Sequence, residues 1–368
     1  MAEILVSGYY GFYNAGDEAI LAGIIRSVRE LAPETTFTAI SGKAAWTRSL
    51  HGVEAVSRGD FRHIWQAVGR ADLVMLGGGT LLQDVTSSKS LTYYLGIVSM
   101  GKTRFKPVML YAQGAGPVRR PLGKTLIPAV INWVDAITLR DAESAETLHH
   151  LGVRRPPTTV TADAALALGP SDPDFGRAQL QQAGLDPSRP VIGVSVRPWK
   201  QPGASLEPPL AAALDRLAVE TGAQIAFIPM QRHNDVQAAQ VVASLMEHRP
   251  VLVQGDFTFP QVMAMVAACD LMVGMRYHAL VFAAMNGVPL VGLSYDPKND
   301  SFLRQIGEEA AGPTWRLDAE TVVTLARKSL SDAAAVKARL RERMAALTPL
   351  SKQNARLAVE LLKRRGRL

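Results

Sequence analysis

Cysteine is almost missing from this chain of 368 residues, which contains one, Cys269, inside an apolar stretch. A single cysteine excludes a disulfide framework and a cysteine-based zinc site, and its apolar neighbours predict a buried structural thiol. The chain also has no Gly-x-Ser-x-Gly elbow and no pair of histidines spaced as in the H-E-x-x-H motif. We therefore expect neither a metal ion nor any other cofactor.

Long apolar runs are missing as well. No segment is apolar for the roughly 20 residues that a helix needs to span a bilayer. The opening residues, Met1 to Ser7, lack the basic region followed by an apolar one that a secretory signal requires. Both absences predict a cytoplasmic protein.

Basic residues are in excess only near the end of the chain. The net charge is +7, but residues 336–368 contain ten Lys or Arg against two Asp or Glu, which leaves 30 basic and 31 acidic residues elsewhere. Proteins that bind nucleic acid usually carry positive charge on a folded face, so nucleic acid is not an expected partner. The basic run at residues 363–367 is typical of a solvated helix end. The alternative is peripheral contact with the anionic inner surface of the membrane.

Short apolar runs alternate with longer helical patterns, which predicts parallel β-sheets covered by helices. The alternation pauses in a segment rich in Pro, Gly and Asp, residues 169–190, and then starts again. We therefore expect two doubly wound, Rossmann-like α/β domains, residues 1–172 and 186–347, that face a cleft. Residues 351–368 are expected to form a basic C-terminal helix. Ligands of such sheets bind beyond the carboxyl ends of the strands, so residues there are the candidates for a site.

In the first domain, the turn after the first strand carries Asn14 and Asp17 at a helix start, where backbone N–H groups favour an anion. Three consecutive glycines follow a later strand: Gly77, Gly78 and Gly79. They permit close approach of a ligand, although they can equally serve only the turn. Gln113 and Arg140 follow two further strands. Together these residues predict a site edge that suits hydroxyl-rich or anionic substrates.

In the second domain, Arg276, Tyr277 and His278 stand at a strand-to-helix turn, and the helix behind them is apolar. Its charged residues lie only at the N-terminal end, where an anion would bind. Lys298 and Arg197 follow two other strands of the same domain. A lone arginine is often part of a surface ion pair, but several cationic residues at strand ends favour a binding site.

Histidine outside this turn is less informative. His233 follows a strand and is a candidate for the lining of the cleft. His51 and the other histidines lie on helical or loop stretches without an evident partner. A lone histidine is most often a partly buried, hydrogen-bonded side chain, so we assign these no role.

The chain resembles the polysaccharide pyruvyl transferase family over almost its whole length. Four elements occur in the family order: residues 8–18, the glycines 77–79, the Arg276-Tyr277-His278 block with its trailing Gly-x-Pro, and residues 294–298. The Arg-x-His block is the specific part, and the glycine turns alone would not suffice. The pattern is most similar to the bacterial members of the CsaB type, which pyruvylate secondary cell-wall polymers that anchor surface-layer proteins.

The resemblance implies a two-domain fold similar to the glycosyltransferase B (GT-B) type, with phosphoenolpyruvate as donor. It implies a lipid-linked saccharide as acceptor, on which a 4,6-linked pyruvate ketal forms at an N-acetylmannosamine residue. It also implies that helix 351–366 packs back on the first domain.

Phosphoenolpyruvate carries roughly three negative charges in its phosphate and carboxylate. A dry cleft can hold such an anion only with about as many positive groups and further hydrogen-bond donors. Arg276, Lys298 and one of Arg197 or Arg140 meet this need, with Tyr277 beside them. No metal is required where cationic side chains neutralise the phosphate.

Ketal formation requires a proton on the vinyl methylene carbon, after which a sugar hydroxyl attacks C2. His278 is the expected general acid because imidazole exchanges protons near neutrality. Asp17 is the candidate that accepts the proton of the attacking hydroxyl. The expected contacts to the acceptor, or to the rim of the cleft, then come from Asn14, the three glycines, Gln113 and His233.

Two other functions fit part of the pattern. A nucleotide-sugar-dependent glycosyltransferase of the same fold would need a carboxylate pair along residues 275–287 to hold the ribose and the donor sugar, and that segment has none. A non-enzymatic scaffold at the membrane surface would use the basic C-terminus, but it would leave the residues after the strands unexplained.

Overall fold

A computed structural model gives the structure of the chain and describes residues 2–85, 88–199 and 205–367. The chain divides into two compact units. Unit 1 comprises Met1–Phe12, Asp17–Leu168 and Leu347–Leu368, and unit 2 comprises Tyr13–Gly16 and Gly169–Ala346. No helix within the described ranges is long and apolar enough to cross a membrane.

Unit 1 is built on a seven-stranded parallel sheet with the strand order β3-β2-β1-β4-β5-β6-β7. Its strands are β1 (Glu3–Tyr10), β2 (Thr36–Ser41), β3 (Glu54–Ser57), β4 (Leu73–Leu82), β5 (Val108–Ala115), β6 (Ala136–Leu139) and β7 (Thr158–Val160). The order reverses between β1 and β4, and the crevice at such a switch point is where doubly wound sheets bind ligands.

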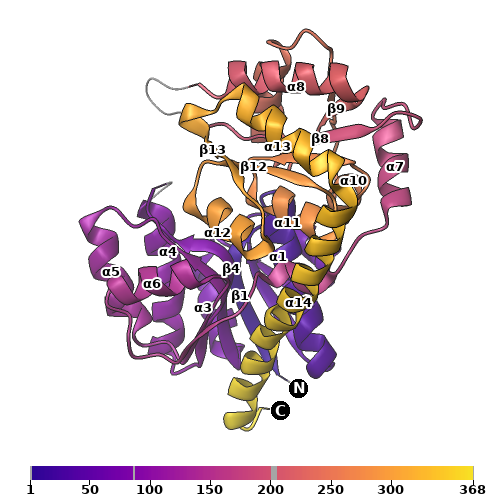
Figure 1. The fold of residues 1–368 in the computed structure, drawn as a ribbon. Coiled ribbons are helices and arrows are strands. Elements are labelled where there is room, and N and C mark those ends of the chain that lie inside the picture. Colours follow the sequence, from indigo (N-terminus) through magenta and orange to yellow (C-terminus); the bar gives the residue numbers. More distant parts are fainter. Residues whose placement is uncertain (1, 86–87, 200–204, 368) are drawn as a thin grey trace. The chain divides into compact units, whose positions relative to one another are not determined.

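The helices of unit 1 follow its strands in alternation. They are α1 (Ala15–Leu31), α2 (Ala44–His51), α3 (Phe61–Arg70), α4 (Ser88–Thr103), α5 (Pro121–Ile131), α6 (Ala142–His150) and the 3₁₀ helix η1 (Ala164–Leu168). Helices α3 and α4 lie beside this sheet (Figure 1). Apolar residues of α3, α4 and α5 join Leu5, Val74 and Val108 of the sheet in one buried cluster. Strand residues between these, such as Met75, are also buried, as expected for a sheet covered on both faces.

Unit 2 contains a six-stranded parallel sheet with the order β10-β9-β8-β11-β12-β13. Its strands are β8 (Val191–Ser195), β9 (Gln224–Phe227), β10 (Val251–Leu252), β11 (Leu271–Gly274), β12 (Leu290–Ser294) and β13 (Ala310–Pro313). The switch point lies between β8 and β11. Cys269 is buried just before β11, and burial raises the pKa of its thiol to about 12, which confirms the expected inert core cysteine.

Seven helices that begin and end within unit 2 accompany this sheet in the described ranges: α7 (Pro173–Gln182), α8 (Glu207–Thr221), α9 (Arg232–Ala243), α10 (Phe259–Ala267), α11 (Tyr277–Met285), α12 (Pro297–Ile306) and α13 (Ala319–Ser331). A 3₁₀ turn, η2 (Thr314–Arg316), precedes α13. Helix α7 lies inside the segment, residues 169–190, over which the alternation of apolar runs and helical patterns pauses. It packs closely on α10, since a Cβ at Gly176 would overlap with the carbonyl of Ala264.

Aspartate caps set the points where the chain turns from strand to helix. Asp141, Asp296 and Asp318 each accept a hydrogen bond from a backbone N–H in the first turn of α6, α12 and α13. This satisfies donors that have no partner inside the helix. Asp141 and Asp296 follow β6 and β12, so two caps lie at the carboxyl edges of the sheets.

The chain ends in one helix, α14 (Ala333–Arg364), rather than in a separate helix over residues 351–368. Proline removes a helix hydrogen bond, which is why Pro349 suggests a break in the sequence pattern. In the structure, hydrogen bonds to residues 161–163 of unit 1 hold the turn that follows Pro349. Ser351 donates to the carbonyl of Asp163 at 2.8 Å, and Asn354 donates to the carbonyl of Ala162 at 3.1 Å. Thr161 donates to Asn354 at 2.7 Å, so this end of α14 is tied into unit 1.

Candidate functional site

The carboxyl edge of the unit 2 sheet collects cationic and aromatic residues. Arg197 follows β8, Arg276 follows β11, and Tyr295 follows β12. Asn299 fixes two of these strand ends together: its buried amide donates to the carbonyls of Met275 at 2.8 Å and of Leu293 at 3.0 Å. The residues after β8, β11 and β12 therefore share one edge, at the switch point of the sheet.

Arg276 forms a buried ion pair with Asp235, a partner that sequence reasoning missed. Its Nε lies 3.1 Å from both carboxylate oxygens, and Nη2 also donates to Asp235 and, at 3.2 Å, to Oε1 of Gln231. The two side chains are 10% and 2% exposed. Asp235 also accepts from the backbone N–H groups of Met230 and Gln231. Asp235 thus orients the guanidinium and balances much of its charge.

The segment Tyr13–Gly16, far away in sequence, is part of this site. The N–H of Ala15 donates to the carbonyl of Met230 at 2.8 Å, and Asn14 forms an isolated antiparallel bridge with Gln231. Asn14 is therefore next to the residue that contacts Arg276. The structure brings this predicted residue into unit 2, whereas Asp17, two residues after Ala15, belongs to unit 1.

His278 stands in the first turn of α11, against the same segment. A Cβ at Gly16 would overlap with the His278 imidazole, so the ring lies directly on the backbone of that glycine. Tyr277 meets the His278 ring edge to face at 5.0 Å between centroids, and Phe282 lies 6.0 Å away. The imidazole is thus positioned by rings on one side and by bare backbone on another.

Tyr295 lies at the centre of a cationic and aromatic cluster. Nη1 of Arg197 donates to the Tyr295 hydroxyl at 3.3 Å, and the guanidinium carbon lies 5.1 Å from the ring centroid. Lys298 Nζ also lies 5.1 Å from that centroid and pairs with Asp296 at 3.5 Å. The Trp199 ring meets Tyr295 edge to face at 5.1 Å.

This cluster has two properties of an anion site. Burial opposes ionisation of Tyr295, but the positive charges of Lys298, Arg197 and Arg276 outweigh burial and the opposing charge of Asp296, and lower the pKa of the phenol. Nε of Arg197 and Nε1 of the neighbouring tryptophan are buried and have no hydrogen-bond partner among the described residues. Unused buried donors beside positive charge are what a multiply charged anion requires.

His233 is exposed on the first turn of α9. Gln231 and Asp235, from the same strand-to-helix connection, contact Arg276 instead. The positions of Gln231 and Asp235 after β9 could have marked them as site residues in the sequence. We did not select them, because a polar side chain at a helix start is usually explained by capping.

In unit 1, the three predicted glycines lie in closely packed surroundings within β4, which continues through them to Leu82 instead of ending in a turn. The Tyr10 hydroxyl donates to the carbonyl of Gly77 at 2.8 Å, and the Gln113 amide donates to the carbonyls of Gly78 and Gly79 at 3.3 and 2.5 Å. Gly78 and Gly79 have φ values of 53° and 77°, which favour glycine. Asp17 lies beside these glycines: its Oδ1 is 3.5 Å from the position that a Cβ on Gly79 would occupy.

Arg140 is buried in unit 1 between carboxylates. It lies 3.3 Å from Asp141 and 3.5 Å from Asp163, and it donates to the hydroxyl of Thr80 at 2.8 Å. Two neighbouring negative charges balance its own. The structure therefore groups Arg197, and not Arg140, with Lys298 and Arg276 in unit 2.

His51, to which the sequence pattern assigned no partner, ends α2 and pairs with Glu18 in the first turn of α1. Its Nε2 lies 2.8 Å from Glu18, and both side chains are almost fully buried. The other carboxylate oxygen of Glu18 accepts from the N–H of Gly11 at 2.8 Å. This pair fixes the turn that precedes Tyr13–Gly16.

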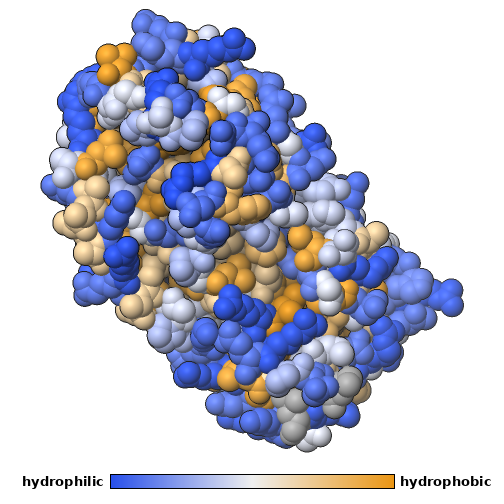
Figure 2. All heavy atoms as spheres, turned by 90° about the vertical axis from the view of Figure 1, so that its right-hand side faces the viewer, coloured by the Kyte–Doolittle hydropathy of each residue, from blue (hydrophilic) through white to orange (hydrophobic). Residues whose placement is uncertain are grey.

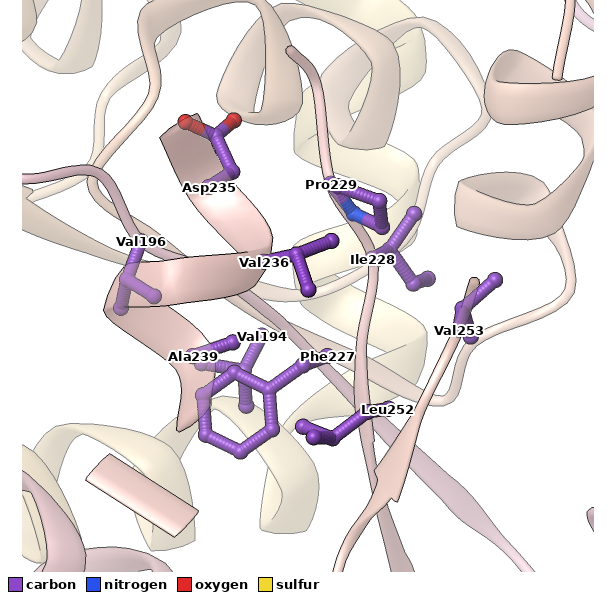
Figure 3. A pocket seen from close by; sticks show the side chains of 10 residues that line it. All are labelled: Val194, Val196, Phe227, Ile228, Pro229, Asp235, Val236, Ala239, Leu252 and Val253. Atoms are coloured by element: carbon purple, nitrogen blue, oxygen red, sulfur yellow. The ribbon is translucent and has the colours of Figure 1, made fainter. Parts of the chain in front are cut away.

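Figure 3 shows a small pocket of about 10 Å³ beside the Arg276 partner. It is lined by apolar side chains of β8, β9, β10, α9 and the residues after these strands, with the Asp235 carboxylate at one end and pointing away from them. The space is that of one water molecule at most, so it belongs to the core. Within the described part of the chain, no group of three or more His, Cys, Asp or Glu side chains could hold a metal ion.

Solved structures share this fold at low sequence identity. S. aureus MnaA, solved with UDP, matches with a TM-score of 0.69 and 11% identity, over 100% of this chain and 98% of that one. Anabaena HepE in complex with UDP and glucose has a TM-score of 0.64 and 15% identity, over 99% and 100%. A UDP-GlcNAc 2-epimerase from Neisseria meningitidis bound to UDP-GlcNAc has a TM-score of 0.63 and 12% identity, over 98% and 100%. These matches confirm the expected Rossmann-like units of a GT-B-like fold.

Comparison with the curated proteins gives no match. The family model for polysaccharide pyruvyl transferase matches residues 14–297, from Asn14 through the Arg276-Tyr277-His278 block to the residue before Lys298. The match covers most of the chain and confirms the family that the sequence resembles. The chain belongs to the polysaccharide pyruvyl transferase family.

Proposed function

We propose that this transferase uses phosphoenolpyruvate as donor and forms a pyruvate ketal on a sugar of a lipid-linked cell-wall polysaccharide precursor. The proposed linkage is a 4,6-ketal on N-acetylmannosamine, as in CsaB-type members of the family. The observation that carries the donor assignment is the cluster of Arg197, Trp199, Tyr295 and Lys298 beside Arg276 in unit 2.

This cluster suits phosphoenolpyruvate by charge and by donor count. The donor carries roughly three negative charges. Arg197 and Lys298 each lie 5.1 Å from the Tyr295 ring centroid, and the positive charge of Arg276 also acts on this phenol, although Asp235 and Asp296 pair with Arg276 and Lys298. Arg197 Nε and Trp199 Nε1 supply N–H groups that no described residue uses. A buried anion is stable only where charge and hydrogen bonds are both satisfied.

The proposed reaction begins with a proton from His278 to C3 of the donor, which converts the methylene into a methyl group and leaves positive charge at C2. A sugar hydroxyl then bonds to C2 and loses its proton, for which Asp17 is the proposed acceptor. A second hydroxyl of the same sugar bonds to C2 and gives its proton back to His278, and the C2–O bond to phosphate breaks. Asp17 then releases the proton of the first hydroxyl to solvent. Inorganic phosphate leaves with the bonding electrons, so the products are the ketal and phosphate.

The alternative is a nucleotide-sugar-dependent glycosyltransferase, which the UDP complexes of the structural neighbours raise as a second candidate. Against it, α11 contributes no carboxylate for a ribose or donor sugar, and Asp235 is already paired with Arg276. The unused donors in unit 2 support a compact anion more directly than a diphosphate sugar.

Ligand-dependent melting separates the two candidates. Phosphoenolpyruvate at 100 times its Kd should stabilise the chain by about 2.7 kcal/mol, while UDP and UDP-GlcNAc should leave the melting temperature unchanged. Arg197→Ala and Lys298→Ala should abolish the shift. Arg216→Ala, which removes an exposed arginine of the same unit paired with Glu320, should keep it.

Product analysis then tests the transfer. Lipid-linked disaccharide should gain the mass of one pyruvate ketal in the presence of phosphoenolpyruvate, with release of one phosphate. Stabilisation by UDP-GlcNAc alone, together with transfer of its sugar, would replace the proposal by the glycosyltransferase function.

A further inference from the structure

Phe105 has an unusual conformation and an unusual exposure. It follows α4 with φ 54°, in the left-handed region, and its side chain is 90% exposed. The N–H groups of Phe105 and Lys106 donate to the carbonyls of Lys102 and Gly101 at 3.0 and 2.9 Å, so Phe105 ends the helix at a position usually taken by glycine. A bulky residue with this φ is a strained outlier. Neither the backbone nor the core of unit 1 explains why phenylalanine stands there.

A second exposed aromatic residue lies at the same edge of the sheet. Trp133 is 63% exposed and precedes β6, as Phe105 precedes β5. These two strands are parallel neighbours, with Met109 paired to Ala136, so the connections that enter them meet at the amino edge of the sheet. This edge is opposite to the carboxyl edge that carries the predicted residues of unit 1. The two rings therefore have no place in the proposed reaction.

Basic residues surround Phe105. A cavity of about 280 Å³ is lined by Phe105, Arg104, Lys106, Arg365 and Arg367, together with Ala71, Asp72 and Pro107. The C-terminal arginines are held there by Asp72, 3.2 Å from Arg367, and by Asp135, 3.6 Å from Arg365. Four cationic side chains and one carboxylate line this cavity, so the basic excess of the C-terminus lies beside the exposed ring.

Anionic lipid is the partner that fits both features. Single exposed hydrophobic residues are ordinary, and the face in Figure 2 carries them scattered among hydrophilic ones. An aromatic ring held outward by a strained backbone and bordered by arginine and lysine is different. Rings of this kind sit at the level of lipid headgroups, and basic side chains bind the anionic headgroups around them. A nucleic acid duplex or an acidic protein surface would use the charge without inserting the projecting phenyl ring.

We propose that the amino edge of the unit 1 sheet docks on an anionic lipid bilayer, with Phe105 and Trp133 inserted among the headgroups and with Arg104, Lys106, Arg365 and Arg367 as their cationic border. The surface would hold the enzyme at a membrane where a lipid-linked saccharide resides. The proposal goes beyond the pyruvyl transfer reaction and does not depend on it, because docking requires neither donor nor acceptor.

Vesicle sedimentation of the full chain tests the proposal without any substrate. Wild-type protein should bind vesicles of phosphatidylcholine mixed with phosphatidylglycerol, more weakly at high salt, and should not bind phosphatidylcholine alone. Phe105→Asn should weaken binding about tenfold, because it removes the apolar ring that is proposed to leave water on insertion among the headgroups. Lys106→Glu should weaken it about fivefold or more. Trp315→Ser and Arg341→Glu, exposed residues of unit 2, serve as matched controls and should bind as wild type.

Asparagine tolerates the left-handed conformation, so Phe105→Asn should not lower the melting temperature. A fold defect therefore cannot account for its loss of binding. The proposal is overturned if wild type ignores anionic vesicles, or if Phe105→Asn and Lys106→Glu bind as tightly as wild type. Displacement from vesicles by millimolar inorganic phosphate would overturn it in favour of a site for a free anion. Binding to DNA that Lys106→Glu weakens and Phe105→Asn does not would assign the edge to a polyanion instead.

Discussion

The backbone of Gly16 lies directly against the imidazole of His278, although the two residues are far apart in the sequence. Gly16 does not have a positive φ, so its backbone does not require glycine. The requirement is space, because any Cβ at this position would overlap with the ring. The missing side chain of Gly16 thus leaves the space that the His278 imidazole fills at the start of α11.

Gly16→Ala should therefore displace His278 and lower phosphoenolpyruvate-dependent turnover by about 10²-fold, since a misplacement of about 1 Å is enough for such a loss. The KM for phosphoenolpyruvate should change little. Steady-state kinetics measure both values. Gly96→Ala is the matched control, because a Cβ there meets no atom within 4 Å. If Gly16→Ala turns over like wild type at an unchanged melting temperature, His278 does not act from its place in this structure.

The ion pair of Arg276 with Asp235 gives a prediction on stability. Asp235→Asn leaves a buried guanidinium without its counter-charge and should destabilise the fold by about 3–5 kcal/mol in urea unfolding. The double variant Asp235→Leu with Arg276→Met should recover most of that stability but not the binding of phosphoenolpyruvate. Glu220→Gln, which breaks the exposed pair with Arg327, is the control and should have little effect. Equal losses for the buried and the exposed pair would contradict the role given to Asp235.

The sequence predicted the fold and the family well, because both depend on local patterns. Alternating apolar runs and helical periods determine two parallel sheets, and residues after strands meet at the carboxyl edges by the geometry of such sheets. Arg197, Arg276 and Lys298 accordingly come together in unit 2. Their roles in donor binding remain proposals, as do those of His278, Asp17, Gln113 and the other predicted residues.

The sequence did not predict contacts that depend on packing between distant segments. Nothing local in Tyr13–Gly16 indicates that it pairs with the residues after β9, because an isolated bridge has no periodic signature. In the sequence, Asp235 is a carboxylate near the start of a helix and Tyr295 an aromatic residue after a strand. Only the structure shows that Asp235 contacts Arg276 and that Tyr295 contacts Arg197. Helix α14 continues through Pro349 while its own Ser351 and Asn354 side chains donate to the backbone carbonyls of Asp163 and Ala162 in the next turn, and a propensity argument cannot include such contacts.

One buried amide contributes two of the hydrogen bonds that attach α14 to residues 161–163 of unit 1, beside the bond from Ser351. Asn354 is fully buried, donates to the carbonyl of Ala162 and accepts from Thr161. Asn354→Leu leaves the buried Ala162 carbonyl without this donor, while Thr161 keeps the Leu139 carbonyl as an acceptor, and should lower stability by about 1–3 kcal/mol. Arg356→Ala, on the exposed side of the same helix, should change it little. Chemical denaturation of both variants measures the difference, and equal stabilities would show that the helix is held by apolar contacts instead.

The lowered pKa of Tyr295 has two opposite consequences for pH dependence. Burial disfavours the phenolate, but Lys298, Arg197 and Arg276 favour it more strongly, so the folded chain releases this proton at a lower pH than an unfolded chain does. Between the lowered pKa and the usual value near 10, the folded state binds fewer protons, so stability should rise with pH in that interval. The gain is complete above the usual value and is lost as the pH falls through the lowered one.

Donor binding should follow the reverse trend. A phenolate among the three cations places a negative charge where the phosphoenolpyruvate anion is proposed to bind, so the KM for the donor should rise with pH over the same interval. Tyr295→Phe should remove both the rise in KM and the gain in stability. The tyrosinate absorbance of wild type minus that of Tyr295→Phe reports the ionisation directly, and phosphoenolpyruvate should shift it to higher pH. Tyr93→Phe is the control, because burial raises the pKa of Tyr93 despite the nearby Arg58. A Tyr295 titration that the donor does not shift would show that the cationic cluster is not the donor site.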